Sequence, residues 1–156
     1  MIWLFLACSH PVAPPDCTTI SVAPLDVAEA ERARVGGPGW TNVEVRVRYL
    51  CEVARIGPAA AAWKAEGRPA DERARLAYQM RHNARMLARA MMPDQDEVAR
   101  LEARDMGKYG TKDGPTFEWL VDRAKAKGLE GDAIYESIVE SAQVTDADVN
   151  RALGLE

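Results

Sequence analysis

One stretch of the sequence gathers side chains that could bind an anion. Arginine recurs at every fourth position at Arg81, Arg85 and Arg89, so on a helix these three side chains share one face. Like charges at that spacing repel one another, and this arginine row therefore calls for an anion from elsewhere. Tyr78 and His82 fall on the same arc. Because tyrosine and arginine often dominate protein–protein binding energy, we take these five residues as the first candidate site.

Three sources of that anion stay open. The first is internal, with the acidic helices near the C-terminus or the stretch Asp94–Glu97 packing against the row. The second is a protein partner with an acidic surface. The third is nucleic acid, which the net charge of −4 for the whole chain disfavours. Residues 68–112 carry a net charge of +3 and residues 113–156 one of −6, which favours the internal source.

A segment rich in turn residues is the second candidate site. It contains Lys108, Gly110, Lys112 and Gly114, and a predicted helix begins directly after it. Two lysines, two glycines and a helix N-terminus could together hold an anion. A structural turn between two helices is the alternative for the same residues.

Several common catalytic and metal-binding patterns do not occur in the sequence. It has no His-Glu-x-x-His, no Cys-x-x-Cys, no phosphate-binding P-loop and no Gly-x-Ser-x-Gly. A histidine zinc site needs several converging ligands, whereas the only histidines are His10 and His82. We therefore expect no metal, no cofactor and no catalytic residue. The competing hypothesis is a small enzyme or toxin domain in residues 68–156, in which His82, the arginines and Glu102 or Asp105 are the active groups.

The helices that would position both candidate sites occupy the second part of the chain. The longest is predicted over residues 71–92, where Leu76, Met80, Ala84, Leu87 and Met91 form an apolar stripe opposite the arginine row. Capping residues, glycines and prolines delimit the others. They are expected at 26–35, 59–66, 96–109, 116–128, 132–142 and 145–153.

Two strands are predicted in the first part of the chain. Residues 17–22 are rich in β-branched types, and from Val43 to Val53 apolar residues alternate with charged ones. Two strands alone are marginal, so they must pack on helices. The predicted fold class is α+β and mainly α, with a small two-stranded β element on a bundle of about four to six helices. A single globular domain would span 17–156, with a β-containing part at 17–56 and a helical part at 58–156.

The first residues point to the bacterial cell envelope. Residues 1–7 form a short apolar, signal-like run that ends before Cys8, and Phe5-Leu6-Ala7-Cys8 resembles the lipobox of bacterial lipoproteins. The resemblance implies a lipid on the Cys8 thiol and an anchored protein that faces the periplasm or the cell surface. Residues 8–16 are rich in proline, which fixes the backbone and favours an extended tether between lipid and domain.

The number of cysteines agrees with that resemblance. If Cys8 of the three cysteines carries the lipid, Cys17 and Cys51 remain as a pair that an oxidising periplasm would join in a disulfide. The alternative is a cytoplasmic protein with reduced, buried cysteines. The leading hypothesis is thus a membrane-anchored envelope lipoprotein that binds or inhibits another protein, as an immunity protein does. The enzyme and a structural envelope component are its alternatives.

Overall fold

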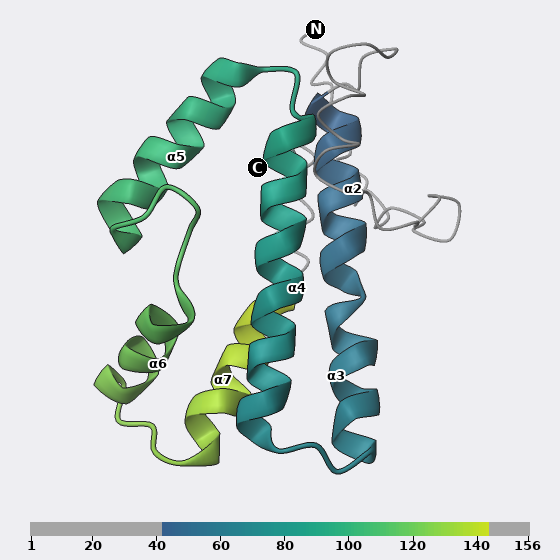
Figure 1. Ribbon diagram of the computed structural model, residues 1–156, viewed down its shortest axis with the longest axis vertical. Coiled ribbons are helices and arrows are strands. Elements are labelled where there is room, and N and C mark those ends of the chain that lie inside the picture. Colours follow the sequence, from purple (N-terminus) through teal and green to yellow (C-terminus); the bar gives the residue numbers. More distant parts are fainter. Residues whose placement is uncertain (1–41, 144–156) are drawn as a thin grey trace, which may run out of the picture.

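All the regular secondary structure in the described part of the chain is α-helix. The computed structural model describes residues 42–143, with side chains from residue 45 onward. Figure 1 shows the helices, which in chain order are α2 (Asn42–Ala54), α3 (Ile56–Ala65), α4 (Ala70–Met91), α5 (Gln95–Tyr109), α6 (Phe117–Ala126) and α7 (Asp132–Ala142). The α+β prediction is therefore wrong for these residues, because none of them lies in a strand.

The segment predicted as the second strand is helix α2 instead. The alternation fails at Leu50, which stands among the charged positions and yet is only 2% exposed. A helical period accounts for the burial, since Val45, Tyr49 and Val53 recur at every fourth residue on one side of α2. Valine favours strands, but that preference is weak and packing overrides it. The first predicted strand at 17–22 lies outside the described residues.

Helices α2 and α3 lie almost end to end beside α4 (Figure 1), and Pro58 in α3 explains why they are not one continuous helix. Pro58 has no N–H, and in a continuous helix its ring would clash with the carbonyl group of Ala54. Helix α2 therefore ends at Ala54, and Pro58 lies in the first turn of α3, where an N–H group has no helical partner anyway.

Helix α4 is the centre of the fold. Its 22 residues span about 33 Å, and it packs against α7, α2 and α3. Three small residues of α4, Ala74, Ala77 and Ala84, are buried and let the neighbouring helices approach closely. Helix α6 packs on α7 and adds Phe117 to the same core, and Figure 1 shows both helices beside the lower half of α4.

Helix α5 is attached near the other end of α4, apart from α6 and α7 (Figure 1). A second, smaller apolar cluster joins it to α2 and α4. Its buried members are Val45, Leu87, Met91, Met92 and Val98. An ion pair between Arg46 of α2 and Glu97 of α5 supplements this contact. The attachment of α5 thus combines few apolar side chains with charged ones.

The helices predicted in the second part of the chain are confirmed. Those expected at 71–92, 96–109 and 132–142 match α4, α5 and α7 within one residue at each end. The expected N-cap of α6 is also present, because the Thr116 hydroxyl accepts the N–H of Trp119 at 3.1 Å. Helix α3 begins three residues earlier than expected. The helices predicted at 26–35 and 145–153 lie outside the described residues.

Candidate functional site

Two members of the arginine row donate to backbone carbonyl groups of other elements. Arg81 Nη1 donates to the carbonyl oxygen of Ala142 at the end of α7, at 3.2 Å. Arg85 Nη1 donates to the carbonyl oxygen of Asp113, also at 3.2 Å, in the connection between α5 and α6. Arg81 also lies over the ring of Tyr49, 5.3 Å from its centre. The row thus ties α4 to α2, α7 and the α5–α6 connection.

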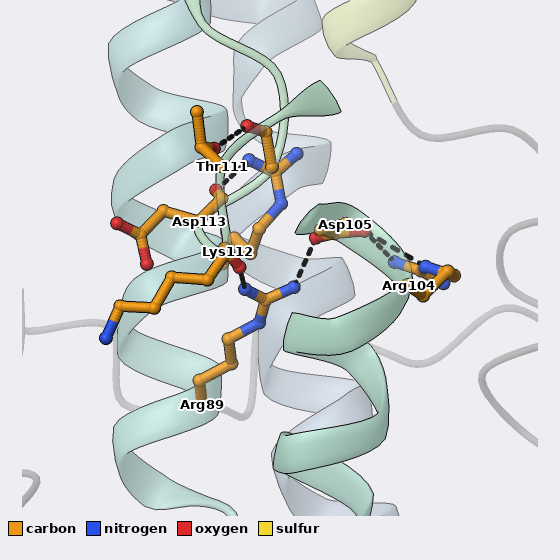
Figure 2. A network of polar contacts seen from close by, with 8 residues as sticks. Arg89, Arg104, Asp105, Thr111, Lys112 and Asp113 are labelled. Atoms are coloured by element: carbon orange, nitrogen blue, oxygen red, sulfur yellow. Dashed lines mark hydrogen bonds and ion pairs between the residues drawn. The ribbon is translucent and has the colours of Figure 1, made fainter. Parts of the chain in front are cut away.

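The third member, Arg89, belongs to a buried ion pair. Figure 2 shows its guanidinium group between Asp105 of α5 and the backbone of Lys112. Nη2 lies 2.5 Å from Asp105 Oδ2, and Nη1 donates to the carbonyl oxygen of Lys112 at 2.5 Å. The side chain of Arg89 is 7% exposed and that of Asp105 1%. Arg104 holds the other carboxylate oxygen of Asp105 at 2.8 Å from a side chain that is 64% exposed.

The charge of Asp105 is stabilised despite its burial. Burial by itself raises the pKa of a carboxyl group, because it disfavours the charged form. Hydrogen bonds from Arg89 and Arg104 outweigh that effect and hold the pKa of Asp105 below its usual value. Asp105 is therefore ionised at neutral pH and neutralises part of the surrounding positive charge.

Arg81 and Arg85 have no such acidic partner. Within residues 45–143 no carboxylate lies within ion-pair distance of either guanidinium group, and their polar contacts are the carbonyl groups already given. Burial, together with the neighbouring Arg81 and Arg89, lowers the pKa of Arg85, although arginine stays charged at any physiological pH. Within the described residues, the direct hydrogen-bond partners of these two guanidinium groups are therefore carbonyl groups, and the carboxylate of Asp105 acts on Arg85 only from a distance.

This charge faces a cavity of about 590 Å³ between α2, α4 and α5, the basic cavity. Six basic residues line it. They are Arg46, Arg81, Arg85, Arg89, Arg104 and Lys108. Among the described lining residues the one acid is Glu97, which is already paired with Arg46. Apolar and aromatic side chains, among them Tyr49, Leu101 and Tyr109, complete the wall.

A second cavity of about 230 Å³, the aromatic cavity, lies between α4, α6 and α7 and shares three lining residues with the first. The shared residues are Arg81, Arg85 and Tyr109. The remaining aromatic lining residues are Tyr78, His82 and Trp119, which lie beside Pro115, Leu120, Ile138, Ser141 and Ala142. The two cavities thus adjoin at the arginine row, one lined by six basic residues and the other by several aromatic side chains.

His82 is the titratable group of the aromatic cavity. Its ring stacks on Tyr78 with the ring centres 5.8 Å apart, and its Nδ1 is buried with no hydrogen-bond partner in the described part of the chain. Burial first and the nearby Arg85 second lower the pKa of His82 below its usual value. The imidazole is therefore neutral at pH 7. Neither Glu102 nor Asp105 is among the described lining residues of this cavity, and the carboxylate whose charge acts on His82 is that of Asp113, which opposes the lowering of its pKa.

The turn-rich segment presents oxygen atoms to the arginine row. The carbonyl groups of Lys112 and Asp113 accept from Arg89 and Arg85, so the backbone here contacts cations of the chain itself. Gly114 has φ +93°, and a Cβ at this position would lie 2.5 Å from Arg85 Nη1. The backbone at Gly114 therefore packs so closely against Arg85 that it leaves no room for a side chain.

The four residues of the second candidate site have different surroundings. Lys108 lines the basic cavity, Gly110 ends α5 with φ 77°, Lys112 is exposed and Gly114 is buried against Arg85. An anion held by this loop stays a prediction.

Sequence reasoning missed the residues that α2 and α5 contribute. Arg46 was assigned to the polar face of a strand, and the helical conformation of α2 instead brings it and Tyr49 to the basic cavity. The counter-charge of the row was expected from the C-terminal helices or from Asp94–Glu97. Within the described residues it is Asp105 that pairs with Arg89, which no spacing in the sequence indicated.

The cysteines and the predicted anchor are mostly outside the described range. Cys51 is buried in α2, whereas Cys8 and Cys17 lie among the residues that are not described. The lipid attachment and the Cys17–Cys51 bridge therefore stay predictions. None of the described helices is both long and apolar enough to cross a membrane, and residues 45–143 contain no group of three or more potential metal ligands.

Comparison with known proteins adds no relative. No family model matches the sequence, and neither a curated protein nor a solved structure matches it. The function is therefore inferred from the side chains of this chain alone.

Proposed function

We propose that the chain is a binding module that recognises an acidic segment of a protein partner in the basic cavity. One observation carries the proposal. Arg81 and Arg85 line a cavity of about 590 Å³ and have no carboxylate at ion-pair distance within the described residues. A desolvated guanidinium group binds a carboxylate through short, charge-assisted hydrogen bonds, often two in parallel. A carboxylate from a partner would therefore supply the negative charge that the described residues do not place beside Arg81 and Arg85.

The shape and lining of the cavity favour a protein segment over nucleic acid. Tyr49, Leu101 and Tyr109 stand among the charges, and such mixed aromatic, apolar and arginine surfaces are typical of the anchor points of protein interfaces. The net charge of −4 opposes the approach of a long polyanion. A single acidic side chain can enter the cavity without bringing a continuous row of phosphates to a chain of net negative charge.

The test uses a defined acidic probe and variants that differ only in where a charge is removed. The probe is a capped tetraglutamate peptide, with capped tetraglutamine as its neutral counterpart, and binding is followed by calorimetry at 0.15 M salt. We expect Arg81→Gln and Arg85→Gln each to weaken tetraglutamate binding roughly ten- to hundredfold, because each removes hydrogen bonds to a charged group. The two substitutions are independent, so Arg81→Gln tests the site even if Arg85→Gln fails to fold.

Arg100→Gln is the matched control. Arg100 is exposed on α5 and lines neither cavity, yet its replacement lowers the net charge of the protein by the same amount. Its affinity for tetraglutamate should stay within about twofold of the wild type at 0.15 M salt, where distant exposed charges are screened. Equal losses for Arg81→Gln and Arg100→Gln, or equal binding of tetraglutamate and tetraglutamine, would contradict the proposal.

We further propose that this module acts at the bacterial envelope, held by a lipid on Cys8. The support is the lipobox-like run before Cys8 and the Pro-rich residues 8–16 that follow. In a bacterial host, a palmitate analogue should label the wild-type protein and not Cys8→Ala. Label that survives this substitution contradicts attachment at Cys8.

A further inference from the structure

We infer that the aromatic cavity binds an aromatic side chain of the partner, next to the acidic residue that the basic cavity takes. This inference rests on the proposed function and adds the identity of the neighbouring residue. It makes the recognised element a short acidic–aromatic sequence rather than any negative surface.

The first argument is the continuity of the two cavities. Arg81, Arg85 and Tyr109 line both of them. A peptide whose carboxylate contacts these arginines therefore lies next to the aromatic cavity. Adjacent or next-adjacent residues of an extended peptide are separated by about 3–7 Å along the chain. One such step leads from the arginine row into the second cavity.

The second argument is the character of the walls. Trp119, Leu120 and Ile138 present apolar surface, and the stacked pair of Tyr78 and His82 presents ring surface. Aromatic side chains pack well against other rings in offset or edge-on geometry, as Tyr109 and Trp119 already do with ring centres 4.8 Å apart. A cavity of about 230 Å³ accommodates one aromatic side chain and not a folded element.

The third argument concerns the polar groups in this cavity. The Ser141 hydroxyl donates to the carbonyl group of Ile138 at 2.9 Å, so its lone pairs remain able to accept. His82 adds a neutral imidazole ring to the wall, and its Nδ1 is buried. A hydroxyl group that can accept suits the polar tip of a tyrosine better than the plain ring of phenylalanine. Tyrosine is therefore the aromatic residue for the test.

The experiment compares three capped tetrapeptides by calorimetry with the full chain. Their sequences are Glu-Glu-Ala-Ala, Glu-Glu-Tyr-Ala and Gln-Gln-Tyr-Ala. We expect the second to bind about tenfold tighter than the first, because a buried aromatic anchor adds to the acidic contact. We expect the third to bind least tightly of the three, because it leaves the arginines without a carboxylate.

A substitution that fills the aromatic cavity supplies the structural control. Ser141→Phe places a ring at the cavity lining from an exposed position, and Ala133→Phe places the same ring on α7 at an exposed position that lines neither cavity. Ser141→Phe should abolish the advantage of the tyrosine peptide, so that Glu-Glu-Tyr-Ala binds no tighter than Glu-Glu-Ala-Ala. Ala133→Phe should preserve the full advantage.

The outcomes separate this inference from the proposed function. If both glutamate peptides bind with equal affinity, the inference is wrong while the proposed function stands. If neither binds, the proposed function is wrong and the inference with it. An advantage that persists in Ser141→Phe also overturns the inference, since the tyrosine must then bind elsewhere.

Discussion

The buried pair of Arg89 and Asp105 makes the strongest prediction about stability. Replacing Arg89 with methionine keeps an unbranched apolar stem and removes the charged guanidinium group. The carboxylate of Asp105, 1% exposed, is then left with Arg104 as its partner among the described residues, and Arg104 holds it from a side chain that is 64% exposed. The protein must therefore either keep an under-compensated buried charge or protonate Asp105.

The expected size of the effect follows from the burial of both partners. Breaking a buried ion pair by removing one partner costs about 3–5 kcal/mol, because the remaining charge stays desolvated. For a chain of this size that corresponds to a decrease in melting temperature of roughly 6–20 °C. Arg104→Met removes a partner of the same carboxylate from an exposed position, where an ion pair contributes about 0–1 kcal/mol. It is the matched control.

The assay is urea unfolding of the wild type, both single variants and the double variant Arg89→Met with Asp105→Leu. The double variant removes both charges, so it should be clearly more stable than Arg89→Met alone. Arg104→Met and Arg89→Met with equal losses of stability would refute the reasoning. A double variant no more stable than Arg89→Met would refute it as well.

The pH dependence of unfolding tests whether the ionised form of Asp105 stabilises the folded chain. The pKa of Asp105 is lower in the folded chain than the value of about 3.9 for an unfolded one. Its contribution to stability is therefore fully present above about pH 3.9 and is lost as the pH falls through the lower, folded value. The stability advantage of the wild type over Arg89→Met should persist at neutral pH and shrink in strong acid, where Asp105 is neutral in every species.

Two further predictions concern the surroundings of Arg85. Gly114→Ala places a side chain at φ +93° and against the Arg85 guanidinium group, so it should destabilise the fold by about 1–3 kcal/mol in thermal unfolding. Gly107→Ala is the control, because Gly107 lies inside α5 with open space around it. This substitution should be neutral or stabilise the fold by up to about 1 kcal/mol. Equal effects would show that the loop does not need its backbone conformation. The pKa of His82 is lowered by burial and by Arg85, so below the unfolded value of about 6.5 the folded state takes up a proton less readily than the unfolded chain. Between pH 7.5 and 5.5 the wild type should therefore lose more stability in urea unfolding than His82→Gln, and identical losses would contradict a buried, neutral imidazole.

The helical part of the fold could be predicted because its helices carry only one period. In residues 71–92 the apolar positions recur at spacings of four and three, which no strand can place on one face. Residues 43–53 carry two periods at once. Alternate valines fit a strand, while Val45, Tyr49 and Val53 fit a helix, and the burial of Leu50 and Arg48 tells the two apart. The strand prediction is wrong because its alternation assigns both residues to a polar face, and valine's preference for strands is weak.

The candidate site was predictable on one helix and not between helices. The shared face of Arg81, Arg85 and Arg89 follows from their spacing alone, and all three line the basic cavity. The atoms that they contact are mostly backbone carbonyl groups, which every residue has and no residue type reveals. The Asp105 partner of Arg89 depends on how α5 folds back past α4, a matter of tertiary packing.

The sparse attachment of α5 has a consequence for how a ligand enters. This helix forms one wall of the basic cavity, and near its start the pair of Glu97 with the partly exposed Arg46 supplements a small apolar cluster. Sub-global opening involves the units with the fewest buried contacts, and an opening of α5 while α4 and α7 stay packed must also break the buried Arg89–Asp105 pair. Its backbone amides should exchange with deuterium faster than those of α4, and more so at high ionic strength, which weakens the Arg46–Glu97 pair. A ligand would then reach the arginines through movement of a whole helix. The carboxylate of Glu97 helps to hold that helix in place, and an acidic ligand carries the same kind of group.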